Sequence, residues 1–114
     1  MKVFTKSSRP SNISYVKGSD KTFTALFQTD TGAVLPVSGV TLTCEVWQLV
    51  NGVRTGSALL TLSPSSIPAG NSAEFTITVA QGASLSYGAT YYCYFYHDDT
   101  VVQADTQPLA LQII

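Results

Sequence analysis

The sequence predicts an all-β protein, an antiparallel β-sandwich of about seven to eight short strands preceded by an extended N-terminal arm. Apolar and polar residues alternate with a period of two over several stretches, and turn-forming residues recur about every ten positions. No stretch suits a long helix. A chain of 114 residues is long enough for one such domain. We expect the arm at residues 1–11 and the sandwich at 12–114.

The two clearest strands are expected at residues 21–28 and 40–49, where every second residue is apolar. In the second strand Trp47 would lie on the face opposite the core. The residues expected to face the core are Phe23, Ala25 and Phe27 in the first strand and Val40, Leu42, Cys44 and Val46 in the second.

A tight hairpin is expected at Asn51-Gly52, because both residues accept the positive φ angles of a type I′ turn. The return strand would be 57–63, and the segment rich in Pro, Ser and Gly at 64–71 predicts a loop between layers. The other expected elements are a short strand within 11–18, a strand at 72–79 with Phe75, Ile77 and Val79 inward, a helical turn within 80–88, and strands at 89–97, 101–105 and 109–114.

The charges are few and unevenly distributed. Only 11% of the residues are charged, and the formal net charge of -1 excludes broad electrostatic binding to nucleic acid. Five of the six basic residues lie in the first 21 positions, so the arm is basic. The arm is either a solvated tail or a segment that docks on an acidic neighbour. Its candidate contact residues are Lys2, Lys6 and Arg9.

Membrane insertion and export are not expected. No apolar stretch approaches the roughly 18 residues that cross a bilayer. The first residues, "MKVFTKSSRP", also lack the apolar core of a secretory signal. We therefore expect a chain that is made in the cytoplasm.

The two cysteines, Cys44 and Cys93, are both expected on inward faces. One interpretation is a disulfide that pins two sheets together, as in immunoglobulin domains, and Tyr91 stands two residues before Cys93 as in a tyrosine corner. The other is a pair of free thiols that act as small apolar core residues. A zinc site needs more ligands than two cysteines and the single histidine supply, so we expect no metal and no cofactor.

His97, Asp98 and Asp99 follow one another at the end of an expected strand. The interpretations are a hairpin turn, a weak cation site, or a catalytic group. Aspartate favours turns because its side chain bonds to nearby backbone, whereas catalysis needs groups that converge in a pocket. We therefore expect a turn here and no enzyme activity.

The outward face of the strand at 89–97 is unusually aromatic. If Tyr91, Cys93 and Phe95 face the core, then Tyr92, Tyr94 and Tyr96 form a row on the other face. Trp47 would lie alongside this row if the two strands share a sheet. This surface suits a protein interface, cover by another part of the same chain, or sugar stacking.

Two segments resemble the N-terminal immunoglobulin-like domain of phage baseplate upper proteins and related phage virion modules. The first is "FTALFQTDTGAVLPVSGVTLTCEV", with its turn at Thr29 to Gly32 and Pro36, Val37 and Gly39 before the next strand. The second runs from Phe75 to Ile114, with Leu85, Gly88, Tyr91 and Cys93 in an "L-x-x-G-x-Y-x-Y"-like pattern. The resemblance covers roughly residues 20–114.

The resemblance implies an immunoglobulin-like sandwich and a non-enzymatic virion structural protein, either a tail or baseplate component or a capsid-decorating protein. Such a protein would be present in several copies and would bind other virion proteins through its arm and its aromatic sheet face. The alternative function is a host-surface or carbohydrate-binding adhesion module. It would use the same tyrosines and Trp47, with Asp98 and Asp99 accepting hydrogen bonds from sugar hydroxyls.

Overall fold

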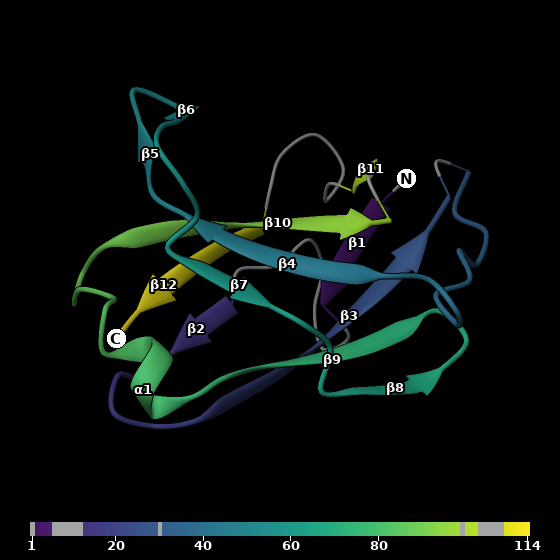
Figure 1. The fold of residues 1–114 in the computed structure, drawn as a ribbon, viewed down its shortest axis with the longest axis horizontal. Coiled ribbons are helices and arrows are strands. Elements are labelled where there is room, and N and C mark those ends of the chain that lie inside the picture. The colour runs from purple at the N-terminus through teal and green to yellow at the C-terminus, as the bar shows by residue number, and fades with distance from the viewer. Residues whose placement is uncertain (1, 6–12, 30, 99, 103–108) are drawn as a thin grey trace.

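The computed structural model describes residues 2–5, 13–29, 31–98, 100–102 and 109–114. Within them the regular structure is almost entirely β, and it forms a four-stranded sheet, a six-stranded sheet and a separate two-stranded ribbon. The two large sheets face each other in Figure 1. This arrangement confirms the predicted all-β class and is compatible with a β-sandwich.

The four-stranded sheet is antiparallel throughout and has the order β1-β3-β9-β8. Its strands are β1 (Lys2–Thr5), β3 (Lys21–Gln28), β9 (Ser72–Ile77) and β8 (Ser66–Ala69).

The six-stranded sheet has the order β2-β12-β10-β4-β7, and β11 also pairs with β10. Its strands are antiparallel except for the parallel pair β2 and β12. The strands are β2 (Ile13–Tyr15), β12 (Leu109–Ile113), β10 (Thr90–His97), β4 (Leu42–Trp47), β7 (Leu60–Leu62) and β11 (Thr100–Val102).

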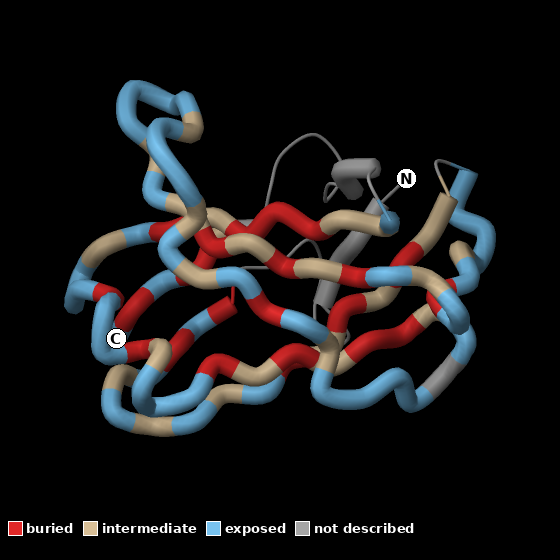
Figure 2. The backbone as a smooth tube through the Cα atoms, in the orientation of Figure 1, coloured by how far each residue is buried: buried red, intermediate tan, exposed pale blue. Residues whose placement is uncertain are grey.

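The core lies between the two sheets, where the buried residues gather in Figure 2. The Phe95 ring of β10 packs edge-on against rings of the opposite sheet, with centroid distances of 5.5 Å to Phe75 and 6.1 Å to Phe27. Edge-to-face contacts of this kind stabilise a core beyond the area they bury. The alternating residues predicted to face inward in β3 and β4 are buried, with the exception of Val40, which lies before β4 and is half-buried.

Two predictions for residues 64–79 were wrong. Residues 64–71 were expected to form a loop, but they contain β8, an irregular edge strand whose register shifts between Ser66 and Ala69. Pro68 is tolerated there because an edge strand does not need every N–H group for pairing. Val79 was expected to face the core, but it is 48% exposed because the strand ends at Ile77 and a helical turn begins.

The predicted helical turn is confirmed as α1 (Val79–Gly82). Thr78 caps it, since its hydroxyl accepts a hydrogen bond from the Gln81 backbone N–H while the Gln81 side chain bonds to the Thr78 backbone N–H. This reciprocal capping box satisfies N–H groups that a helix start leaves unpaired. No helix in the described ranges is long and apolar enough to cross a membrane.

Part of the predicted basic arm belongs to the sheet. Lys2–Thr5 form β1, which pairs with β3 at the edge of the four-stranded sheet. Because these backbone groups are paired, this segment is an edge strand rather than an extended arm. Lys6 and Arg9 lie outside the described residues, and so does the side chain of Lys2.

Candidate interaction face

The aromatic face is formed by the outward side chains of β4 and β10, which are antiparallel neighbours. Trp47 lies directly opposite Tyr92, and Glu45 lies directly opposite Tyr94. Residues that are paired in this way, and their neighbours two positions along, share one face of a sheet. The prediction that Trp47 lies beside the tyrosine row is therefore confirmed.

A two-stranded ribbon follows β4 and carries a further residue to this face. It consists of β5 (Leu49–Val50) and β6 (Val53–Arg54), joined by Asn51 and Gly52 with φ angles of 53° and 76°. These angles belong to the predicted type I′ turn, and only the short ribbon, rather than a strand of the main sheet, returns directly from it. The ribbon projects at the upper left of Figure 1.

Arg54 of this ribbon lies over the aromatic face. Its guanidinium carbon Cζ is 4.2 Å from the ring centroid of Tyr94 and 5.2 Å from that of Trp47. Its Nη1 donates a hydrogen bond of 2.8 Å to the hydroxyl oxygen of Tyr96. Cations are attracted to the negative face of an aromatic ring, so Arg54 uses both its charge and its hydrogen-bonding capacity here.

Glu45 supplies the negative charge of the cluster. Its Oε1 accepts a hydrogen bond of 3.0 Å from Trp47 Nε1 and lies 3.9 Å from Arg54 Nη1. The hydrogen bond to Tyr96 raises the pKa of Arg54, and the Glu45 charge adds to this shift, while partial burial acts against it. Because the side chains of Arg54 and Glu45 are 33% and 25% exposed, water screens their ion pair and it contributes little stability.

The cluster is therefore covered in part by its own chain. Tyr94 is only 8% exposed, whereas Tyr92, Tyr96 and Trp47 are half-buried. Arg54 covers the centre of the row and leaves its flanks accessible to a partner. We call Trp47, Tyr92, Tyr94 and Tyr96, with Arg54 and Glu45, the aromatic face.

Sequence reasoning identified the four aromatic residues but missed Arg54 and Glu45. The Asn51-Gly52 pair indicated that the chain turns back after β4. Glu45 has the same parity as Trp47 along β4, so its place on this face followed from the alternation. No sequence feature near Arg54 indicates that the ribbon lies over the aromatic face, because its position depends on the direction of the chain after β4.

Cys44 and Cys93 lie buried in the core as free thiols. They belong to the neighbouring strands β4 and β10 of one sheet. The interpretation of the pair as a disulfide that links two sheets is therefore wrong. Cys44 is directly opposite Phe95, which leaves Cys93 one diagonal step away. Desolvation by burial, together with the adjacent Cys93 thiol, raises the pKa of Cys44 well above its ordinary value.

The residues after β10 form the predicted turn. Asp98 has a φ angle of 54°, its N–H donates to the carbonyl oxygen of Thr41 at 2.8 Å, and its Oδ1 accepts from the Thr41 N–H at 3.2 Å. His97 Nε2 donates to the Pro36 carbonyl oxygen at 2.8 Å. These contacts give both side chains structural roles. Asp99 lies outside the described residues.

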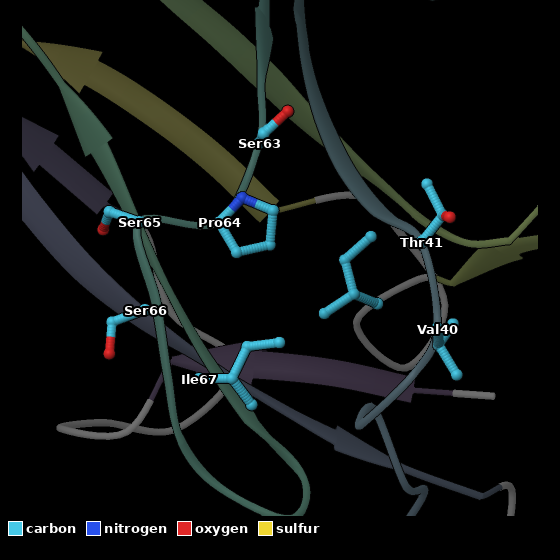
Figure 3. A pocket seen from close by; sticks show the side chains of 8 residues that line it. Val40, Thr41, Ser63, Pro64, Ser65, Ser66 and Ile67 are labelled. Atoms are coloured by element: carbon cyan, nitrogen blue, oxygen red, sulfur yellow. The ribbon is translucent and has the colours of Figure 1, made fainter.

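A shallow pocket of about 340 Å³ opens at one edge of the two large sheets. In Figure 3, Pro64 and Ile67 stand on one side of it and Val40 and Thr41 on the other. Its remaining lining residues are Leu42, Ser63, Ser65 and Ser66. None of these side chains titrates near neutral pH, so the lining provides no general acid or base.

Comparisons with known proteins add no family to these observations. No protein-family model matches the sequence, and no curated protein matches it.

Proposed function

We propose that this chain is a non-enzymatic immunoglobulin-like module. Immunoglobulin domains place strands A, B, E and D in one sheet and C, F and G in the other. The orders β1-β3-β9-β8 and β12-β10-β4 follow this pattern, with β7 in the place of an additional strand beside C. Tyr91 adds support, since its hydroxyl accepts a hydrogen bond of 3.0 Å from the Ser86 N–H, as in a tyrosine corner.

We further propose that the module is a bacteriophage virion structural protein, a tail or baseplate component or a capsid-decorating protein. This assignment rests on the sequence resemblance over roughly residues 20–114 to phage baseplate upper proteins and related virion modules. In this proposal the protein is made in the host cytoplasm and is incorporated in several copies. Its partners are other virion proteins.

The aromatic face is the observation that supports a binding function most directly. It gathers tryptophan, tyrosine and arginine, the residue types that contribute most to protein–protein binding. Tyr92 and Tyr96 are half-buried, so they combine exposed ring surface with a fixed position on a sheet. Rigid anchors of this kind lose little conformational entropy on binding. The face therefore suits a protein partner.

Mass photometry of the purified chain mixed with the proteins encoded by its neighbouring genes tests this function. We expect a complex with at least one of these proteins, and we expect Tyr92→Ala to weaken it by about tenfold or more. Thr24→Ala is the matched control, because Thr24 lies on the outer face of the other large sheet. A chain that stays monomeric and binds none of these proteins would contradict the proposal.

The adhesion alternative is disfavoured by Arg54. Sugars stack on the open faces of aromatic rings, and the guanidinium already lies over the rings of Tyr94 and Trp47. A glycan array separates the two functions. Glycan binding that is lost in a Tyr96→Ala variant would favour the adhesion module over the virion component.

A further inference from the structure

We propose that the aromatic face binds an arginine side chain of a protein partner, and that Arg54 occupies this site from within the chain until the partner displaces it. The proposal rests on the proposed protein-binding function and names the chemical group that the partner presents. It begins from Arg54 itself, because this residue shows which kind of group the face accommodates.

The site has the parts that a guanidinium requires. Tyr94 provides a ring beneath the cation at 4.2 Å, and Trp47 provides a second ring at 5.2 Å. The hydroxyl of Tyr96 accepts a hydrogen bond, and the Glu45 carboxylate balances the charge at 3.9 Å. A planar guanidinium stacks and donates hydrogen bonds at the same time, whereas an ammonium group only approaches as a point charge. The site is therefore matched to arginine rather than lysine.

The segment that carries Arg54 is weakly attached to the rest of the molecule. The ribbon of β5 and β6 belongs to neither large sheet, and its backbone pairing is confined to two residues on each side. Val50 and Val53 are 56% and 61% exposed, so they bury little apolar surface. Gly56 follows with a φ angle of 78°, a conformation that glycine adopts without strain, so the ribbon ends at a bend rather than in a continuing strand. A two-stranded ribbon of this size is marginal in water by itself.

Arg54 is therefore a replaceable occupant. A partly exposed cation–π contact contributes little free energy, and a surface ion pair adds little more. A partner that places an arginine in the site and also covers the half-buried Tyr92 would gain contacts that Arg54 does not make. Release of the ribbon would then expose the central tyrosine, Tyr94, to the partner.

The experiment uses Trp47, the only tryptophan of the chain, as a fluorescent reporter within the site. The purified full chain and its Arg54→Ala variant are titrated with N-acetylarginine amide and with N-acetylcitrulline amide. The citrulline compound has the same shape but carries no charge. Circular dichroism verifies that the variant is folded.

We expect Arg54→Ala to bind N-acetylarginine amide about tenfold more tightly than the unmodified chain, because the competing residue from the same chain is gone. Binding of the citrulline compound should be about tenfold weaker than that of the arginine compound. Val53→Ala is the matched control, since it changes the same ribbon but retains Arg54, and it should behave like the unmodified chain. Adding Tyr94→Leu to Arg54→Ala should abolish the binding.

Three results would overturn the proposal: no saturable fluorescence change in Arg54→Ala, equal affinity with and without Arg54, or equal affinity for the two compounds. The titration needs no virion protein, so its outcome is separate from that of the mass photometry. If the chain forms a virion complex but does not bind N-acetylarginine amide, only the proposal of an arginine site is rejected. If it binds N-acetylarginine amide but forms no virion complex, the proposed assembly function is rejected and the arginine site stands.

Discussion

The ring of Tyr15 packs directly against Gly82, with no room for a side chain at position 82. Tyr15 is fully buried at the end of β2, and its hydroxyl donates a hydrogen bond of 2.7 Å to the carbonyl oxygen of Ser19. Gly82 is the last residue of α1 and is buried as well. The helical turn thus closes one end of the core, and the glycine permits the close approach.

We expect Gly82→Ala to destabilise the protein by about 1–3 kcal/mol, since the added methyl group overlaps a buried ring that is held in place by its hydrogen bond. Urea unfolding followed by circular dichroism measures the change as a lower midpoint. Gly70→Ala is the matched control, because a methyl group at position 70 meets no atom within 4 Å. An equal loss of stability in both variants would argue against the Tyr15 contact as the cause.

The strands that alternate most regularly were predictable from the sequence. In β3, Phe23 and Phe27 face the core while Thr22 and Thr24 face outward. Successive side chains of a strand point to opposite faces, so burying one face of the strand makes every second residue apolar. The strand β8 shows no such alternation because it is an irregular edge strand containing Pro68. Its pairing with β9 depends on a neighbour rather than on its own composition.

The candidate site was predictable only in part, for a related reason. The row of Tyr92, Tyr94 and Tyr96 follows from alternation within one strand. The position of Arg54 over Tyr94 depends instead on the direction in which the ribbon leaves β4. That direction results from contacts between the ribbon and β10, such as the one between Arg54 and Tyr96, which are far apart in the sequence. A pattern within one short segment does not reveal such contacts.

Tyr91→Phe should destabilise the protein by about 1 kcal/mol. Tyr91 is 3% exposed and its hydroxyl accepts a hydrogen bond from the Ser86 N–H, so the substitution removes a part-buried hydrogen bond. Thermal unfolding measures the loss. Tyr92→Phe provides the comparison, because the half-buried Tyr92 lies on the outward face of the same strand. The prediction fails if the two variants unfold at the same temperature.

Asp98→Ala should cost about 1 kcal/mol of stability, because alanine loses the hydrogen bond from the Thr41 N–H and tolerates the φ angle of 54° less well than aspartate does. Asp98→Asn should remain close to the unmodified chain, since asparagine retains an oxygen acceptor and accepts positive φ. Chemical unfolding of the two variants provides the measurement. An equal loss in the two variants would show that the negative charge, which both substitutions remove, matters more than the turn geometry.

The buried Cys44 thiol predicts a loss of stability at alkaline pH. Burial raises the pKa of Cys44 in the folded protein, so the folded state retains the thiol proton after an unfolded chain, with a thiol pKa of about 8.5, has released it. The stability that the neutral thiol contributes is therefore complete below about pH 8.5 and is lost as the pH rises toward the folded pKa. We expect a decline of roughly 1 kcal/mol per pH unit above that point, measured by urea unfolding at a series of pH values.

Cys44→Ala isolates this effect from the pH dependence that the rest of the chain gives to both proteins. The variant is expected to be less stable at neutral pH, because it loses buried contacts in the core. Its stability should nevertheless decline less steeply with pH, since the titrating thiol is gone. The quantity to compare is the change in the free energy of unfolding per pH unit in the unmodified chain and in the variant. Parallel curves from about pH 7 to about pH 10 would mean that the Cys44 thiol ionises as readily in the fold as in the unfolded chain.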